Sequence, residues 1–172
     1  MLKLAGILLL MIGCTGLGIN KASEEKRRIK ELREIRRMII RMQNEMRYGK
    51  RTLPEICLLF GECMEEPYRN TFTALFHKME ENDGTVLNKM WKEQMNACMK
   101  GLPLKEEEKN ILINLPQHLG MQDETMQAAD IGQSLDMIEN HIRQAEAEYE
   151  SKIRVIMSIS VMAGLFLTIL LL

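Results

Sequence analysis

The residues of this chain that could do chemistry are its four cysteines, its three histidines and one run of three glutamates. No two cysteines form a C-x-x-C pair, and none stands at zinc-site spacing from a histidine. Unpatterned thiols fit a reducing compartment better than a disulfide framework. We therefore predict buried, small apolar cysteines and isolated histidines on the surface or in the core, at Cys14, Cys57, Cys63, Cys98, His77, His118 and His141.

The glutamate run Glu106–Glu108 occupies consecutive positions, so on a helix its carboxylates spread around the axis instead of converging. It is typical of the first turn of a helix, where the dipole favours acidic side chains. The chain also has no Walker A glycine loop, no HExxH and no GxSxG motif. We predict a protein without catalytic residues, metal or cofactor.

Two apolar runs bracket the chain. Residues 155–172 carry no charged side chain, and about 18 apolar residues cover most of a hydrocarbon core that is roughly 30 Å thick. Residues 4–19 form a shorter run that fits a retained membrane helix, a cleaved signal peptide, or a lipoprotein signal ending at Met11-Ile-Gly-Cys14. Because Lys3 is the only basic residue before this run, we predict the retained helix.

Basic residues gather on the inner side of both runs. Eight lysines and arginines lie between residues 21 and 37, and Arg143, Lys152 and Arg154 precede the last run. The positive-inside rule then predicts a cytoplasmic middle part and two external termini. We predict three parts: a transmembrane helix at 1–20, a cytoplasmic helical bundle at 21–154 and a second transmembrane helix at 155–172. The middle part has 22 basic and 24 acidic residues, a net charge of −2, so we predict no nucleic-acid partner.

Apolar residues of the middle part recur at spacings of three and four, which predicts helices. The first stripe comprises Ile29, Leu32, Ile35, Ile39, Met42 and Met46. Short stripes follow from about 53 to 64, 72 to 79, 87 to 98 and 104 to 115, separated by proline, glycine or an Asn-Asp-Gly turn. From Asp123 onward there is no proline, and one stripe continues into the last apolar run. We predict an all-α fold of six helices whose last helix is about 50 residues long.

The turn between the first two helices has the clearest local signals. Gly49 can end the first helix, with a left-handed backbone as its expected conformation. Thr52 can cap the second helix, with Pro54 in its first turn and Glu55 at the third position of a capping box. These residues predict an α-hairpin.

This turn also carries a family likeness. Glu45-Met-Arg-Tyr48-Gly49 followed by Leu53-Pro54-Glu55 resembles the E-I-x-Y-G-x-T-P-L-x-E pattern of the stage III sporulation protein AB family of endospore-forming Firmicutes. The start Met1-Leu-Lys-Leu-Ala-Gly and the Leu119-Gly120 turn are similar in order and spacing. Arg51 and Thr52 depart from the usual Thr-Pro, and Lys152-Ile-Arg departs from K-M-Y.

The resemblance implies a six-helix antiparallel bundle like the cytoplasmic domain of the F-type (GspF-like) platform proteins of type II secretion. It implies a non-enzymatic platform in the mother-cell membrane around the forespore, within a secretion-like channel complex. The implied partners are a secretion-type ATPase similar to stage III sporulation protein AA, other membrane proteins of the stage III sporulation A complex, membrane lipids, and a second copy of the chain.

The residues that we expect to bind a partner surround the turn: Glu45, Arg47, Tyr48, Gly49 and Leu53. Each also has a purely structural explanation, such as packing for Tyr48 or a local ion pair for Glu45. The alternative function is a lipoprotein or tail-anchored regulator whose helical domain lies outside the cytoplasm, and Cys14 is the residue that would carry the lipid.

Overall fold

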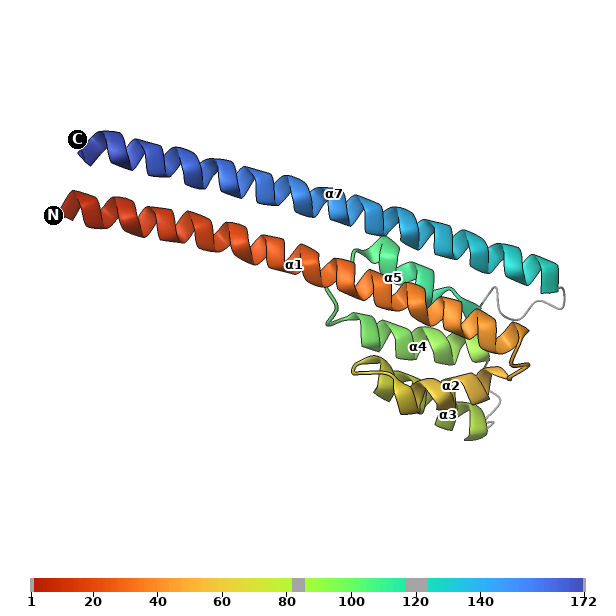
Figure 1. Cartoon of the computed structure of the whole chain (residues 1–172). Coiled ribbons are helices and arrows are strands. Elements are labelled where there is room, and N and C mark those ends of the chain that lie inside the picture. Colours follow the sequence, from red (N-terminus) through yellow and green to blue (C-terminus); the bar gives the residue numbers. More distant parts are fainter. Residues whose placement is uncertain (1, 82–85, 117–123, 172) are drawn as a thin grey trace. The chain divides into compact units, whose positions relative to one another are not determined.

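The computed structural model describes the backbone of residues 2–81, 86–116 and 124–171. Side chains are described for residues 23–81, 86–116 and 130–156, and for 158, 159, 162 and 166. The described residues form six α-helices and no strand, as the sequence predicts (Figure 1). The helices are α1 (Leu2–Arg47), α2 (Leu53–Cys63), α3 (Tyr68–Glu81), α4 (Leu87–Met99), α5 (Glu106–Ile113) and α7 (Glu124–Leu171).

The two long helices confirm that each end of the chain continues directly into the helical part. α1 has 46 residues and α7 has 48, close to the predicted length of about 50. Among the fully described residues, no helix has the length and apolar character needed to cross a membrane. The side chains of 4–19 and most of those of 155–172 lie outside the described set, so both spans stay predictions.

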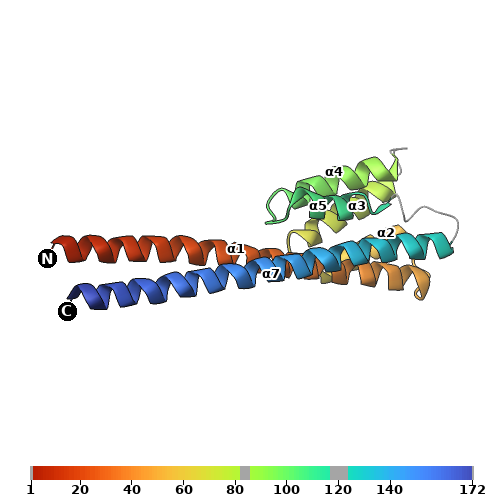
Figure 2. The ribbon, with the colours of Figure 1, turned by 90° about the horizontal axis from the view of Figure 1, so that it is seen from above.

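The chain divides into two compact units, and each is described by itself. Unit 1 comprises Met1–Lys30 and Ile142–Leu172, and unit 2 comprises Glu31–His141. In unit 1, the segments of α1 and α7 run side by side in opposite directions (Figure 2). The buried charged residue Arg28 joins them through Glu148 at 2.9 Å.

The core of unit 2 is built around three aromatic rings from successive helices. Phe60 of α2 meets Phe72 of α3 edge-on at a centroid distance of 5.0 Å. Phe72 then meets Trp91 of α4 at 5.9 Å, and the Trp91 indole N–H donates to the Leu112 carbonyl oxygen of α5 at 2.9 Å. These contacts fix the order α2, α3, α4, α5, because each edge-to-face pair or hydrogen bond joins one helix to the next.

The segments of α1 and α7 that belong to unit 2 supply the rest of its core. Leu32, Ile35, Ile39 and Met42 are buried, as the first apolar stripe predicts. Ile131 and Ile138 of α7 are buried as well. Side-chain pairs tie these segments to their neighbours: Tyr68 donates to Glu31 at 3.1 Å, and Arg36 lies 3.0 Å from Glu139.

The predicted short helices have the right positions. Glu81 ends α3 and Leu87 begins α4, and the Asn82-Asp83-Gly84 turn and Thr85 between them lie outside the described residues. Glu106, Glu107 and Glu108 form the first turn of α5, which confirms that this acidic run begins a helix.

Candidate partner-binding site

The predicted site lies at the turn between α1 and α2. The backbone of α1 ends through hydrogen bonds from the Tyr48 and Gly49 N–H groups to the Asn44 carbonyl oxygen, at 2.9 and 3.3 Å. The Arg51 N–H then donates to the Glu45 carbonyl oxygen at 3.1 Å. These bonds satisfy the last acceptors of the helix and hold the turn against it.

The role predicted for Gly49 is wrong in one respect. The left-handed residue of the turn is Lys50, with a φ of 49°, and Gly49 does not have a positive φ of this kind. Gly49 is required for space instead, because a Cβ there would lie 2.7 Å from the Glu45 carbonyl oxygen and 2.8 Å from its carboxylate. A lysine with positive φ is uncommon and costs backbone energy.

The start of α2 confirms the capping box. The Glu55 carboxylate accepts from the Thr52 backbone N–H at 2.7 Å and from the Thr52 hydroxyl at 2.9 Å. The backbone hydrogen bond has the largest effect on the pKa of Glu55, which it lowers. The hydrogen bond from the Thr52 hydroxyl and the charge of Arg51 lower this pKa further. The positive φ of Lys50 reverses the chain after α1. The capping box between Thr52 and Glu55 then fixes the part of the turn that leads into α2.

Tyr48 is the most exposed large apolar side chain of the described residues, at 73%. The Arg47 guanidinium carbon lies 5.5 Å from the centroid of its ring, within the range of a cation–π contact. Packing inside the domain therefore does not account for Tyr48, which corrects the structural explanation of this residue. Tyrosine and arginine are both enriched among the hot-spot residues of protein interfaces.

The remaining predicted residues support the turn. The Glu45 carboxylate lies 3.5 Å from the Arg51 guanidinium, which confirms a local ion pair. Leu53 is half-buried at the start of α2. The structure thus brings Glu45 and Gly49 together and aligns Arg47 with Tyr48. Lys50 and Arg51 were not among the predicted site residues, although two consecutive basic residues after Gly49 were a signal for them.

The cysteines of the described part divide by burial. Cys57 and Cys98 are buried as predicted, and burial raises the pKa of both thiols, that of Cys57 to about 12. A thiol held protonated in this way is a poor nucleophile. The prediction for Cys63 is wrong, because this residue ends α2 on the surface, where the Arg41 guanidinium donates to its sulfur at 3.2 Å.

The histidines and the acidic run do not gather into a metal site in the part of the chain that is described. No group of three His, Cys, Asp or Glu side chains there could hold an ion. Glu108 is fully buried, accepts from the Lys105 N–H at 2.8 Å and lies 3.8 Å from His141. His118 lies outside the described residues.

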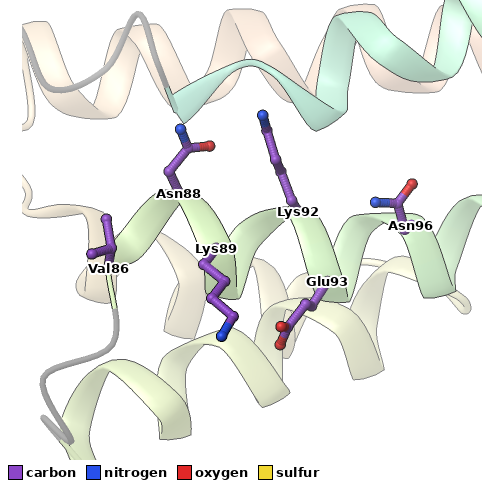
Figure 3. A pocket seen from close by; sticks show the side chains of 6 residues that line it. All are labelled: Val86, Asn88, Lys89, Lys92, Glu93 and Asn96. Atoms are coloured by element: carbon purple, nitrogen blue, oxygen red, sulfur yellow. The ribbon is translucent and has the colours of Figure 1, made fainter.

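A hollow of about 410 Å³ lies along α4. Figure 3 shows the side chains that line it. Its lining consists of Val86, Asn88, Lys89, Lys92, Glu93 and Asn96. None of these is a cysteine, serine or histidine. The α1–α2 turn, with its exposed Tyr48 and its capping box, therefore stays the candidate site for binding a partner.

Comparison with known proteins identifies the family. Residues 3–172 match the family model of stage III sporulation protein AB. The curated stage III sporulation protein AB of Bacillus subtilis (strain 168) is 24% identical over 171 residues, which cover 99% of both chains.

A solved structure of stage III sporulation protein AB (SpoIIIAB) has the same fold as this chain. It superimposes with a TM-score of 0.65 at 20% identity, covering 72% of this chain and 97% of that one. The matched family is not a known enzyme family. Since the family model covers nearly the whole length, the chain belongs to the stage III sporulation protein AB family, whose members are sporulation proteins.

Proposed function

We propose that this chain is a non-enzymatic membrane platform that docks a cytoplasmic secretion-type ATPase through its α1–α2 turn. It would act in a secretion-like channel complex between mother cell and forespore, together with other membrane proteins of the stage III sporulation A complex. The observation that carries the proposal is the exposed Tyr48 stacked by Arg47 on a turn whose backbone is fixed from both sides.

The chemistry of the turn supports docking of a protein surface. A tyrosine contributes a large rigid contact area at a low cost in conformational entropy, and the neighbouring guanidinium can pair with a carboxylate of the partner. Because the capping box and the Arg51 N–H bond already order the turn, little entropy remains to be lost on binding.

The exposed face of α7 supports a membrane location. Among its described side chains up to Arg154, the outward ones are mostly charged or polar, and Met137 is the one large apolar side chain that is exposed. Beyond Arg154 four large apolar side chains are exposed: Val155, Ile159, Met162 and Phe166. Their spacing of four, three and four places them on one helix face. An exposed apolar ridge of this kind is stable where lipid replaces water around it. The domain would then lie in the mother-cell cytoplasm, next to the membrane that surrounds the forespore.

The test of docking is co-purification of the neighbouring ATPase with the full chain extracted from membranes. We expect Arg47→Glu to weaken binding about 30-fold, as expected for loss of an interface hot spot of roughly 2 kcal/mol. Tyr48→Ala should have a similar effect. The control is the charge reversal Lys100→Glu at an exposed position after α4.

Two results would contradict the proposal. Retention of full ATPase binding by both turn variants would remove the turn as a docking site. Failure of the unmodified chain to bind the ATPase would remove the docking function itself. Cysteine-accessibility mapping from both membrane faces tests the location, and a diacylglyceryl group on Cys14 found by mass spectrometry would favour the lipoprotein alternative.

A further inference from the structure

Four charged residues link α1 to α7 inside unit 1. The Arg28 guanidinium lies 3.0 Å from Glu25 on its own helix and 2.9 Å from Glu148 on α7. The Lys152 ammonium lies 2.6 Å from Glu25. We call Glu25, Arg28, Glu148 and Lys152 the ion cluster.

The ion cluster differs from an ordinary surface pair because it is partly buried. The Arg28 side chain is 5% exposed and that of Glu25 is 16% exposed. Charges in such a position gain little net stability over apolar side chains, because desolvation offsets their attraction. In some helix pairs, a buried polar or charged group instead favours one pairing of the helices over the alternatives.

The order of charges along the two helices makes that discrimination possible. On α1 the sequence reads acidic at Glu25 and basic at Arg28, and on α7 it reads acidic at Glu148 and basic at Lys152. Because the helices are antiparallel, Glu25 meets Lys152 and Arg28 meets Glu148. Each charge of the ion cluster has its complement in this one alignment.

A slip of one helical turn in either direction places like charges opposite each other. If α7 shifts so that Arg28 faces four residues further along, it meets Lys152 in place of Glu148. If α7 shifts the other way, Glu25 meets Glu148, and Arg28 meets the neutral Gln144. Either slip therefore combines repulsion with the loss of a partner for a buried charge.

We infer that the ion cluster is a register lock, and that Arg28 is the positioning residue that holds α1 and α7 in one axial alignment. The lock prevents one helix from sliding past the other by a turn. An axial movement of the helical part would therefore displace α1 and α7 together, and it would reach both apolar runs at the same time. This inference is independent of the docking proposal.

The test measures the axial alignment directly in the full chain, reconstituted in lipid or detergent. Spin labels are attached at Ser23→Cys and Ala147→Cys, two exposed unit 1 positions outside the ion cluster. Cys14 and the exposed Cys63 are replaced by serine, and the buried Cys57 and Cys98 are retained. A one-turn slip moves the labels by about 5 Å along the helix axis.

The decisive variant inverts only the α1 half of the cluster, with Glu25→Lys and Arg28→Glu. In the wild-type alignment both inverted side chains would face like charges, whereas a slip in either direction gives one of them an opposite charge. We expect the label separation to shift by up to about 5 Å or to split into two populations. Adding Glu148→Arg and Lys152→Glu should restore the wild-type separation.

The matched control inverts the exposed pair Glu150 and Arg154, which lie 3.9 Å apart within α7 alone. It should leave the separation unchanged. An unchanged separation in the half-inverted variant would overturn the inference. If that variant does not fold, the full inversion decides: recovery of the single wild-type separation supports the lock, and failure to recover it overturns the lock.

Discussion

Gly49 is the residue of the candidate site whose substitution has the clearest physical consequence. The Glu45 carbonyl oxygen that would meet an added Cβ also accepts the Arg51 N–H, so it cannot move away without breaking that hydrogen bond. Crowding at this point therefore opens the turn rather than merely displacing a side chain.

We expect Gly49→Ala to destabilise the protein by about 1–3 kcal/mol, because the alanine Cβ collides with backbone atoms. The matched substitution is Gly132→Ala in α7, where nothing lies within 4 Å of the added Cβ. That change should stabilise the protein by about 1 kcal/mol through helix propensity. Thermal denaturation followed by circular dichroism measures both effects, and equal midpoints for the two variants would contradict the crowding explanation.

The pKa of Glu25 predicts a response to acid. Burial acts to raise this pKa, but the hydrogen bonds and charges of Lys152 and Arg28 outweigh it, so the pKa lies below the ordinary 4.5. A lowered pKa in the folded state contributes stability that is complete above the unfolded-state pKa and is lost as pH falls through the folded-state value. The melting temperature of Glu25→Gln should therefore fall less than that of the wild type as the pH is lowered below 4.5. Parallel curves for the variant and the wild type would show that Glu25 makes no such contribution.

At the scale of the elements, the aromatic contacts join four short helices that are each too short to be stable alone. α2 has 11 residues and α5 has 8, below the length at which isolated helices form in water. Phe60, Phe72 and Trp91 are all fully buried, so the packing of each helix depends on its neighbours. The hydrogen bond from the Trp91 indole to the Leu112 carbonyl oxygen also fixes the orientation of the indole ring against α5.

Trp91→Phe tests that hydrogen bond. The substitution keeps an aromatic ring beside Phe72 but leaves the Leu112 carbonyl oxygen without its indole donor. We expect a loss of about 1–3 kcal/mol in the free energy of unfolding, measured with urea. The exposed Tyr48→Phe should change it by no more than about 0.5 kcal/mol. A Trp91→Phe variant as stable as the Tyr48→Phe variant would assign the Trp91 contribution to packing alone.

Local signals in the sequence predicted the helices well, because each signal involves neighbouring residues. Thr52, Pro54 and Glu55 identified the start of α2, and the absence of proline after Asp123 identified α7 as one helix. Burial of Arg28 and Glu108 was not predictable in the same way. The α7 partner of Arg28 is 120 residues away along the chain, and a charged residue reads as exposed until that partner is known.

The candidate site shows the same division. The sequence indicated where the turn lies and that Gly49 matters. It did not indicate that Lys50 would take the left-handed conformation, since glycine is the expected residue there. Gly49 is needed for a different reason, because a Cβ there would crowd Glu45, and only the three-dimensional arrangement of the turn reveals this.

At the scale of the whole molecule, α1 and α7 each contribute residues to both units. In the proposed function, an unbroken α7 carries a change in the helical domain to the predicted membrane segment without a flexible linker. The helix itself would then be part of the mechanism, in addition to any role as an anchor.

A glycine-serine insertion at Ser151 tests this role. We expect the variant to stay in the membrane fraction while sporulation efficiency, measured by heat-resistant colony counts, falls at least about tenfold, because glycine interrupts the helix. The same insertion at Gly101, in the turn after α4 with open space around it, should be tolerated. Normal sporulation of the Ser151 variant would reduce the last run to an anchor.

The position of Trp91 also gives the protein a built-in optical probe. The chain has a single tryptophan, and its indole is fully buried with its N–H bonded to a carbonyl oxygen. Its fluorescence therefore reports on the core of unit 2, where Trp91 contacts Phe72 of α3 and the Leu112 carbonyl oxygen of α5. Emission should move to longer wavelength when these helices separate, so binding of a partner or loss of the ion cluster can be examined for its effect on this core without attaching a dye.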